Sequence, residues 1–102
     1  NLKLYQEAIK DFSQSIRMKE KYAEAYNNRG NAYYELDQYE KARADFDQSI
    51  RLRPKYSKAH MNRGLAYYQM ENLDQACKDF KRACDLGECD GLKWIMQSGS
   101  CK

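Results

Sequence analysis

Four cysteines are the most reactive side chains in this 102-residue sequence, and all of them lie in its last quarter. They are Cys77, Cys84, Cys89 and Cys101. Paired as disulfides, they require an oxidising compartment. As four thiolates they would bind zinc, although the usual Cys-x-x-Cys spacing is absent. As free thiols, Cys77 and Cys84 would act as small core residues of a helix.

No other set of side chains has the pattern of a catalytic site. The single histidine, His60, has no nearby Cys, Ser or acidic residue at the spacing of a catalytic triad. A glycine-rich phosphate loop is missing, and no Cys-x-x-Cys motif supports a redox role. The sequence therefore predicts a protein that is not an enzyme and uses no cofactor and no catalytic metal.

The charge pattern does not indicate nucleic acid or a membrane as the partner. The formal charge is +3, from 18 basic and 15 acidic residues. A nucleic-acid site needs a continuous basic face, and Glu24, Glu35, Asp45 and Glu71 interrupt the basic residues. No apolar run approaches the roughly 18 residues of a membrane-spanning helix. We therefore expect neither nucleic acid nor a membrane as partner.

The elements that carry these residues repeat along the chain. Residues 23–56 align with 57–90 at a shift of 34 positions, and residues 11–22 align with 45–56 in the same way. Identities at this shift include Asn28/Asn62, Arg29/Arg63, Gly30/Gly64, Tyr33/Tyr67, Ala42/Ala76 and Phe46/Phe80. Residues of similar type recur every three or four positions within each half of a unit. Each unit is therefore predicted to be a pair of antiparallel helices.

Small residues predict close packing inside each helix pair. Gly30 lies in the middle of the first helix, where glycine costs about 1 kcal/mol relative to alanine. Ala42 occupies the facing helix, so both backbones can approach closely, and Phe46 is expected to fill the space toward the next hairpin. Pro54 ends the second helix because proline cannot continue the hydrogen-bond ladder.

This pattern resembles the tetratricopeptide repeat family over most of the chain. The family's small-residue, Tyr, Ala, Phe and Pro positions correspond to Gly30, Tyr33, Ala42, Phe46 and Pro54, and in the next unit to Gly64, Tyr67, Ala76 and Phe80. Tyr26 and His60 replace the family's early Trp, and Glu88 replaces the second Pro. Arg29 and Arg63 replace the Leu beside the glycine, and we expect them to pair with carboxylates or cover Tyr rings. The resemblance implies an all-α solenoid of helix hairpins.

The resemblance also implies that the first helix of each hairpin lines a concave groove. Carried over position by position, the predicted peptide-binding residues are Asn27, Asn28, Asn31, Tyr34, Lys58, Met61, Asn62, Leu65 and Tyr68, with Glu24, Glu35 and Gln69 beside them and Lys55 and Tyr56 at the lip. Asn side chains can bond to peptide amides, and Tyr offers aromatic area with a hydroxyl. We therefore expect a protein or peptide partner. The alternative is that these side chains are simply solvated, or that Tyr34 packs against Tyr68.

Some family members bind acidic C-terminal tails of chaperones through a carboxylate clamp, and this chain carries only part of one. Asn28, Asn31 and Lys58 occupy clamp-type positions. Asn27 stands where a Lys is expected, and Asn62 where an Arg is expected. Because a terminal carboxylate is held mainly by charge-assisted bonds, we do not expect a full clamp here.

Residues 91–102 are predicted to form a capping helix and a Cys-containing tail. Gly87 indicates a helix stop with positive φ. Apolar side chains then follow at Leu92, Trp94, Ile95 and Met96. They are expected to cover the exposed face of the last hairpin, with Trp94 in the core of the cap.

The cap suggests how the cysteines pair. A short antiparallel cap brings Cys101 back toward Cys77, and Cys89 lies in the turn just beyond Cys84. Among three connectivities, Cys84–Cys89 with Cys77–Cys101 fits this hairpin best. The tail also resembles those of some exported bacterial repeat proteins. We expect a periplasmic or otherwise exported protein if the cysteines are bonded, and a cytoplasmic one otherwise.

The predicted organisation leaves one helix face uncovered. Residues 1–22 hold the second helix of a truncated repeat, ahead of repeats 23–56 and 57–90. In this assignment Leu4, Tyr5, Ala8 and Phe12 lack their partner helix. The alternative function is therefore a structural solenoid that stacks on further repeats, or self-associates with another copy, through this face.

Overall fold

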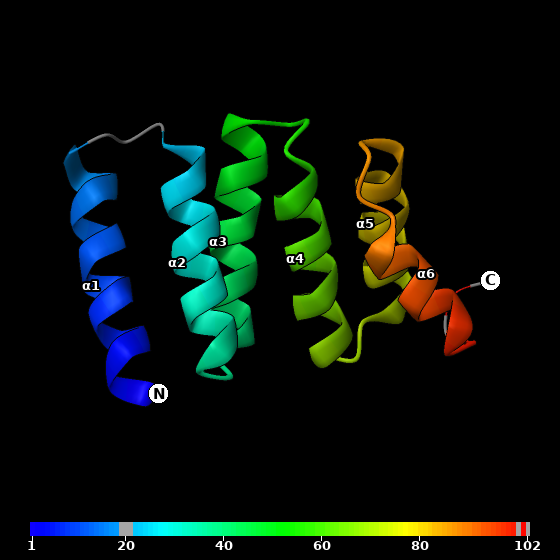
Figure 1. Ribbon diagram of the computed structural model, residues 1–102, viewed down its shortest axis with the longest axis horizontal. Helices are drawn as coiled ribbons and strands as arrows, with labels where there is room; N and C mark the ends of the chain where they lie inside the picture. Colours follow the sequence, from blue (N-terminus) through cyan, green and yellow to red (C-terminus); the bar gives the residue numbers. More distant parts are fainter. Residues whose placement is uncertain (19–21, 100, 102) are drawn as a thin grey trace.

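The computed structural model describes residues 1–18, 22–99 and 101, and it is a row of helices (Figure 1). Over that part of the chain the elements are six α-helices and no strands: α1 Leu2–Met18, α2 Ala23–Glu35, α3 Tyr39–Leu52, α4 Ser57–Gln69, α5 Leu73–Asp85 and α6 Asp90–Gln97. The molecule measures 41 × 27 × 17 Å because the helices stack along one axis. The predicted all-α solenoid of helix hairpins is confirmed.

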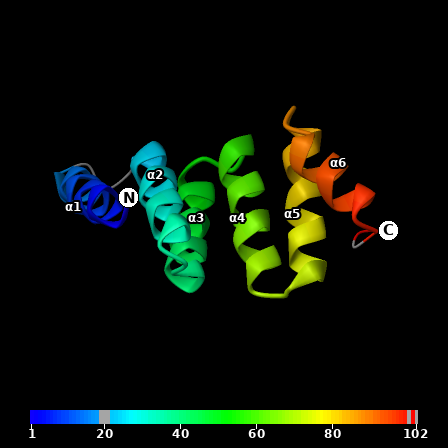
Figure 2. The ribbon, with the colours of Figure 1, turned by 60° about the horizontal axis from the view of Figure 1, so that its bottom comes forward.

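The helices form two layers that differ in how closely they pack. α2 pairs with α3 and α4 with α5, and each hairpin contacts the next. α2 also contacts α4, and α4 contacts α6, whereas no contact joins α3 to α5 in the described residues. Figure 2 shows α4, α5 and α6 following one another at the C-terminal end. α2, α4 and α6 therefore form the more closely packed, inner layer, with α1, α3 and α5 in the outer layer.

The turns that end the helices share one backbone motif. Asp37 and Glu71, one repeat apart, have φ values of 60° and 63°. At the first turn the Gln38 N–H donates to the Tyr33 carbonyl at 2.9 Å, as in a Schellman motif. Gly87 ends α5 with φ 107°, so the predicted positive φ at this position is confirmed.

The core depends on the absence of side chains at the helix crossings. A Cβ atom on Gly30 would lie 2.6 Å from the Phe46 ring, and one on Gly64 would lie 2.9 Å from the Phe80 ring. Both rings are fully buried. Phe46 also packs near Ala66 of the next hairpin. The prediction that these glycines allow close approach is confirmed, and each ring fills the space that its glycine leaves.

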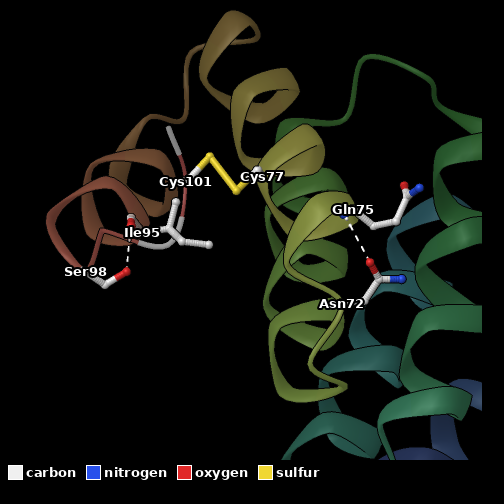
Figure 3. Close-up of a disulfide and its surroundings, with 6 residues drawn as sticks. All are labelled: Asn72, Gln75, Cys77, Ile95, Ser98 and Cys101. Atoms are coloured by element: carbon white, nitrogen blue, oxygen red, sulfur yellow. Dashed lines mark hydrogen bonds between the residues drawn. A yellow bond between two sulfur atoms is a disulfide. The ribbon is translucent and has the colours of Figure 1, made fainter.

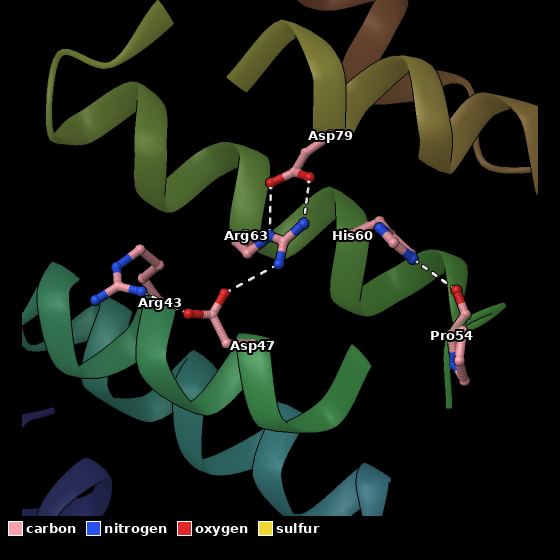
Figure 4. A network of polar contacts seen from close by, with 6 residues as sticks. All are labelled: Arg43, Asp47, Pro54, His60, Arg63 and Asp79. Carbon is pink, nitrogen blue, oxygen red and sulfur yellow. Dashed lines mark hydrogen bonds and ion pairs between the residues drawn. The ribbon is translucent and has the colours of Figure 1, made fainter. Parts of the chain in front are cut away.

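Arg63 joins three helices through hydrogen bonds (Figure 4). Its Nε and Nη2 donate to the Asp79 carboxylate of α5 at 2.8 and 2.7 Å. Its Nη1 donates to Asp47 of α3 at 3.0 Å. These hydrogen bonds to Asp79 raise the pKa of the Arg63 guanidinium, against the opposing effect of burial. Arg63 therefore connects its own hairpin to the preceding one.

Arg29 makes the equivalent contacts one repeat earlier. Its Nε and Nη2 donate to Asp45 at 2.8 and 2.7 Å, and its Nη1 donates to Ser13 of α1 at 3.1 Å. The guanidinium also lies 5.8 Å from the Tyr33 ring centroid. The prediction that these arginines pair with carboxylates and cover Tyr rings is confirmed.

The capping helix α6 buries a narrower face than the sequence suggested. Gly91 and Ile95, four residues apart, are buried, and Ile95 packs against Phe80. Trp94 is 44% exposed, so its predicted place in the core of the cap is wrong. A helix of eight residues has only one face toward α5, and Trp94 lies at the edge of that face.

Candidate peptide-binding groove

The side chains predicted for peptide binding are carried by the inner helices α2 and α4. Asn28, Asn31 and Lys58 are exposed, while Tyr34, Met61, Asn62, Leu65 and Tyr68 are half-buried. Asn27 is different, because it is only 3% exposed. Its Oδ1 accepts a hydrogen bond from Asn62 Nδ2 at 3.0 Å. Asn27 is therefore turned into the structure, where it links α2 to α4.

A second polar contact joins the same two helices near their other ends. Gln69 Nε2 donates to the Tyr34 hydroxyl at 3.2 Å. The Tyr34 ring packs edge-on against Tyr39, with 5.3 Å between the ring centroids. Tyr68 packs instead against Trp94, with centroids 4.8 Å apart. The alternative expectation was that Tyr34 packs against Tyr68. In the structure each of these rings packs against another ring instead, Tyr34 against Tyr39 and Tyr68 against Trp94.

The two inner helices offer different surfaces. On α2 the exposed groove residues are the amides Asn28 and Asn31. On α4 the side chains of Met61, Leu65 and Tyr68 pack against the core cluster that Phe80 and Ile95 belong to. The groove therefore changes from polar on α2 to partly apolar on α4.

Sequence reasoning missed that α6 continues the inner layer. α6 contacts α4 as α4 contacts α2. A Cβ atom on Gly91 would lie 2.5 Å from the Phe80 ring, a ring that Gly64 approaches from α4. The signal was present in the sequence, because α6 begins soon after the helix stop at Gly87, where the first helix of a further repeat would begin.

Several charged side chains lie at the lip of the groove, beside Tyr56. Glu24 and Arg53 form an ion pair at 3.6 Å, and the Arg53 guanidinium lies 4.8 Å from the Tyr56 ring centroid. Burial, followed by the negative charge of Glu24, raises the pKa of Tyr56 above its usual value. Lys55 and Lys58 are exposed at this same end. Glu24 and Arg53 offset each other's charge, and Lys55 and Lys58 add exposed positive charge at this end of α2 and α4.

The single histidine has a structural environment rather than that of a catalytic residue. His60 is buried, and its Nε2 lies 2.8 Å from the Pro54 carbonyl oxygen. In the described part of the chain, no three His, Cys, Asp or Glu side chains are grouped as metal ligands would be. No helix of that part has the length and apolar character needed to cross a membrane.

The cysteines form two separate pairs rather than one cluster. Cys77 of α5 meets Cys101 of the tail, with 5.7 Å between their Cα atoms (Figure 3). Cys84 meets Cys89 across the α5–α6 turn, with 4.0 Å between Cα atoms. Both separations are within reach of a disulfide, which cannot span Cα atoms more than about 7 Å apart. These are the two pairs that the sequence predicted.

Models of known protein families match most of this helical array. A model described as a TPR repeat matches residues 3–37 and 30–71, and a model described as a tetratricopeptide repeat matches residues 57–88. The chain belongs to the tetratricopeptide repeat family. The resemblance drawn from the repeated residues is thus confirmed. No curated protein sequence matches this tetratricopeptide repeat chain.

Solved tetratricopeptide repeat domains have a closely similar structure. The first TPR of Spaghetti (RPAP3), bound to the HSP90 peptide SRMEEVD, is 27% identical with a TM-score of 0.86, and the match covers 94% of this chain and 80% of that one. The second TPR domain of human RPAP3, in complex with the HSP70 peptide SGPTIEEVD, is 30% identical with a TM-score of 0.85. That match covers 91% of this chain and 79% of the RPAP3 domain. The TPR domain of Arabidopsis OM64 is 25% identical with a TM-score of 0.90, and the match covers 94% of this chain and 80% of that domain.

Proposed function

We propose that this chain is a non-enzymatic interaction scaffold that binds a peptide or protein segment on its concave face. The observation that carries the proposal is the inner surface of α2 and α4, where exposed amides lie beside half-buried apolar side chains. Asn28 and Asn31 can both donate to and accept from an extended backbone. Tyr34, Leu65 and Tyr68 supply apolar area of the kind enriched at binding surfaces. Two similar domains are solved with peptides bound, which supports this assignment.

The groove favours a partner other than a strongly acidic C-terminal tail. Lys58 is exposed at a clamp-type position, but Asn62 takes the place of an expected Arg. Asn27, where a Lys is expected, is buried against Asn62. Charge-assisted bonds to a carboxylate are about twice as strong as neutral ones, so their loss weakens binding of such tails.

Selection from a random peptide library on the immobilised chain, followed by affinity measurement, tests the proposal. The test variant is Asn28→Ala/Asn31→Ala, whose side chains are exposed on α2, and the control is Arg51→Ala/Lys81→Ala on the outer helices. Two lost hydrogen bonds of roughly 1 kcal/mol each predict at least tenfold weaker binding for the test variant. Equal affinities for wild type and the α2 variant would contradict binding in the groove.

A second candidate function is a structural one, in which the α1 face stacks on another helix. Leu4 is 61% exposed on this face. Asp11 is exposed too, whereas Asp45 and Asp79, one and two repeats on, are buried against arginines. These contrasts support a helix from a further repeat, or from another copy, as the partner of α1. Light scattering distinguishes the cases, because association should rise with concentration and weaken in Leu4→Ser, whereas a strict monomer excludes self-association.

We also propose that the two cysteine pairs are disulfides that fasten α6 to α5. The Cα separations of 5.7 and 4.0 Å support this state, and the separation into two pairs gives no support to a four-thiolate zinc site. Bonded cysteines would place the chain in an exported compartment, for example a bacterial periplasm. Mass spectrometry without reductant should show the loss of about four protons. Four alkylatable thiols in the native protein would reject this proposal.

A further inference from the structure

A cleft opens at the turn between α4 and α5, at the end of the groove opposite the lysine lip. Its volume is about 470 Å³, and Tyr68, Gln69, Glu71 and Leu73 line it. This volume lies within the range of ligand-binding clefts, roughly 300–1,000 Å³. Tyr68 and Gln69 are the last groove residues of α4, so the cleft continues the concave face beyond the end of that helix.

The apolar side chains around this cleft remain partly open to solvent. Leu73 lines it and is 40% exposed. Trp94, 44% exposed, packs edge-on against the Tyr68 ring from α6. Neighbouring exposed apolar residues on a soluble protein mark interaction surfaces, and Trp and Tyr contribute much of the binding energy at such surfaces. The cleft therefore fits an apolar side chain of a partner.

Charge sets the chemistry expected beside that side chain. Among the described residues that line the cleft, Glu71 is the charged one. Its backbone is fixed in the turn with φ 63°. Lys58 lies near the start of α4, roughly 20 Å away along the helix at about 1.5 Å per residue. This distance exceeds the Debye length of about 8 Å at physiological ionic strength, so Lys58 does not cancel the negative charge of Glu71.

We infer that this cleft binds an apolar side chain of the partner peptide that is followed by a Lys or Arg. The apolar side chain contacts Tyr68 and Leu73, and the basic residue pairs with the Glu71 carboxylate. This inference rests on the proposed peptide-binding function and deepens it by naming the partner's chemistry at one end of the groove. It also gives the groove a direction, because a negative cleft at one end and lysines at the other favour one orientation of a charged peptide.

The fluorescence of Trp94, the only tryptophan in the sequence, provides the assay. Three ten-residue peptides of Gly and Ser are titrated, carrying at their centre Leu-Lys, Leu-Glu or Ser-Lys. The Leu-Lys peptide should bind at least fivefold more tightly than either of the others. In Glu71→Lys the preference should reverse toward Leu-Glu, and in Leu73→Ser binding should fall at least fivefold. Asp37→Lys, at the equivalent exposed turn one repeat earlier, is the matched control and should bind as wild type does.

Several results would overturn the inference. They are a fluorescence response to none of the peptides, a preference for Leu-Glu in the wild type, or an unchanged preference in Glu71→Lys. If the library-selected peptide still depends on Asn28 and Asn31 in such a case, the groove binds peptides and only the cleft assignment fails. If that dependence is also absent, the proposed function fails as well.

Discussion

Replacing Arg63 with leucine, the residue that the family carries beside this glycine, is expected to destabilise the fold strongly. Asp79 is 4% exposed, and both its carboxylate oxygens accept hydrogen bonds from Arg63. Removing one partner of a buried ion pair costs about 3–5 kcal/mol, because the other charge stays buried without compensation. Arg63 is itself partly exposed, so water can reach the vacated site, and the lower figure of about 3 kcal/mol is expected.

Urea denaturation followed by circular dichroism measures this loss. Arg63→Leu should lower the free energy of unfolding by about 3 kcal/mol. The double variant Arg63→Leu/Asp79→Leu should regain at least half of it, because no uncompensated charge remains. Arg43→Ala is the control, since Arg43 pairs with Asp47 at the surface one turn along α3, where such pairs contribute about 0.5 kcal/mol or less.

The reasoning depends on the difference between these variants. A loss below about 1 kcal/mol for Arg63→Leu would show that Asp79 does not need its partner. Losses that simply add in the double variant would show that the two side chains act independently. Either result would remove the role of the Arg63–Asp79 pair in holding α4 against α5.

Other substitutions test the packing, the turns and the cap. Gly30→Ala should lower stability by roughly 1–3 kcal/mol in thermal denaturation, because the new Cβ would lie 2.6 Å from the buried Phe46 ring; a gain would contradict this packing. Asp37→Gly should raise stability by about 1 kcal/mol, because it relieves a left-handed backbone at φ 60°, and an unchanged midpoint would count against it. Cys77→Ser/Cys101→Ser should lose roughly 3 kcal/mol, the chain-entropy value for a loop of 24 residues, and identical stability of wild type with and without reductant would oppose this.

The repeat could be predicted because the same pattern of residues occurs in 23–56 and again in 57–90. Gly30 and Gly64 tolerate their helical positions only where a ring fills the vacant space, and Phe46 and Phe80 stand at the same shift. Even the contact from Arg63 to Asp47 follows that shift, since Ser13 is in the same position relative to Arg29. Residues one repeat apart occupy equivalent environments, so each pair of equivalent residues gives the same information about the fold twice.

Features that occur once were harder to predict. Trp94 has no counterpart, so its apolar character suggested a buried place that the single contacting face of α6 does not offer. Asn27 looked like a groove residue, but only the three-dimensional approach of α2 and α4 reveals its bond to Asn62. The cleft at Glu71 and Leu73 also depends on how the turn is placed against Tyr68, which no local pattern determines.

Chemical-shift mapping with a library-selected peptide tests the central claim most directly. Backbone amide shifts of the isotope-labelled chain are recorded during titration, so every described helix is observed at once. Binding in the groove predicts the largest changes on α2 and α4, centred on Asn28, Asn31 and Tyr34. Changes concentrated on α3 and α5, or on the open face of α1, would contradict a concave binding site.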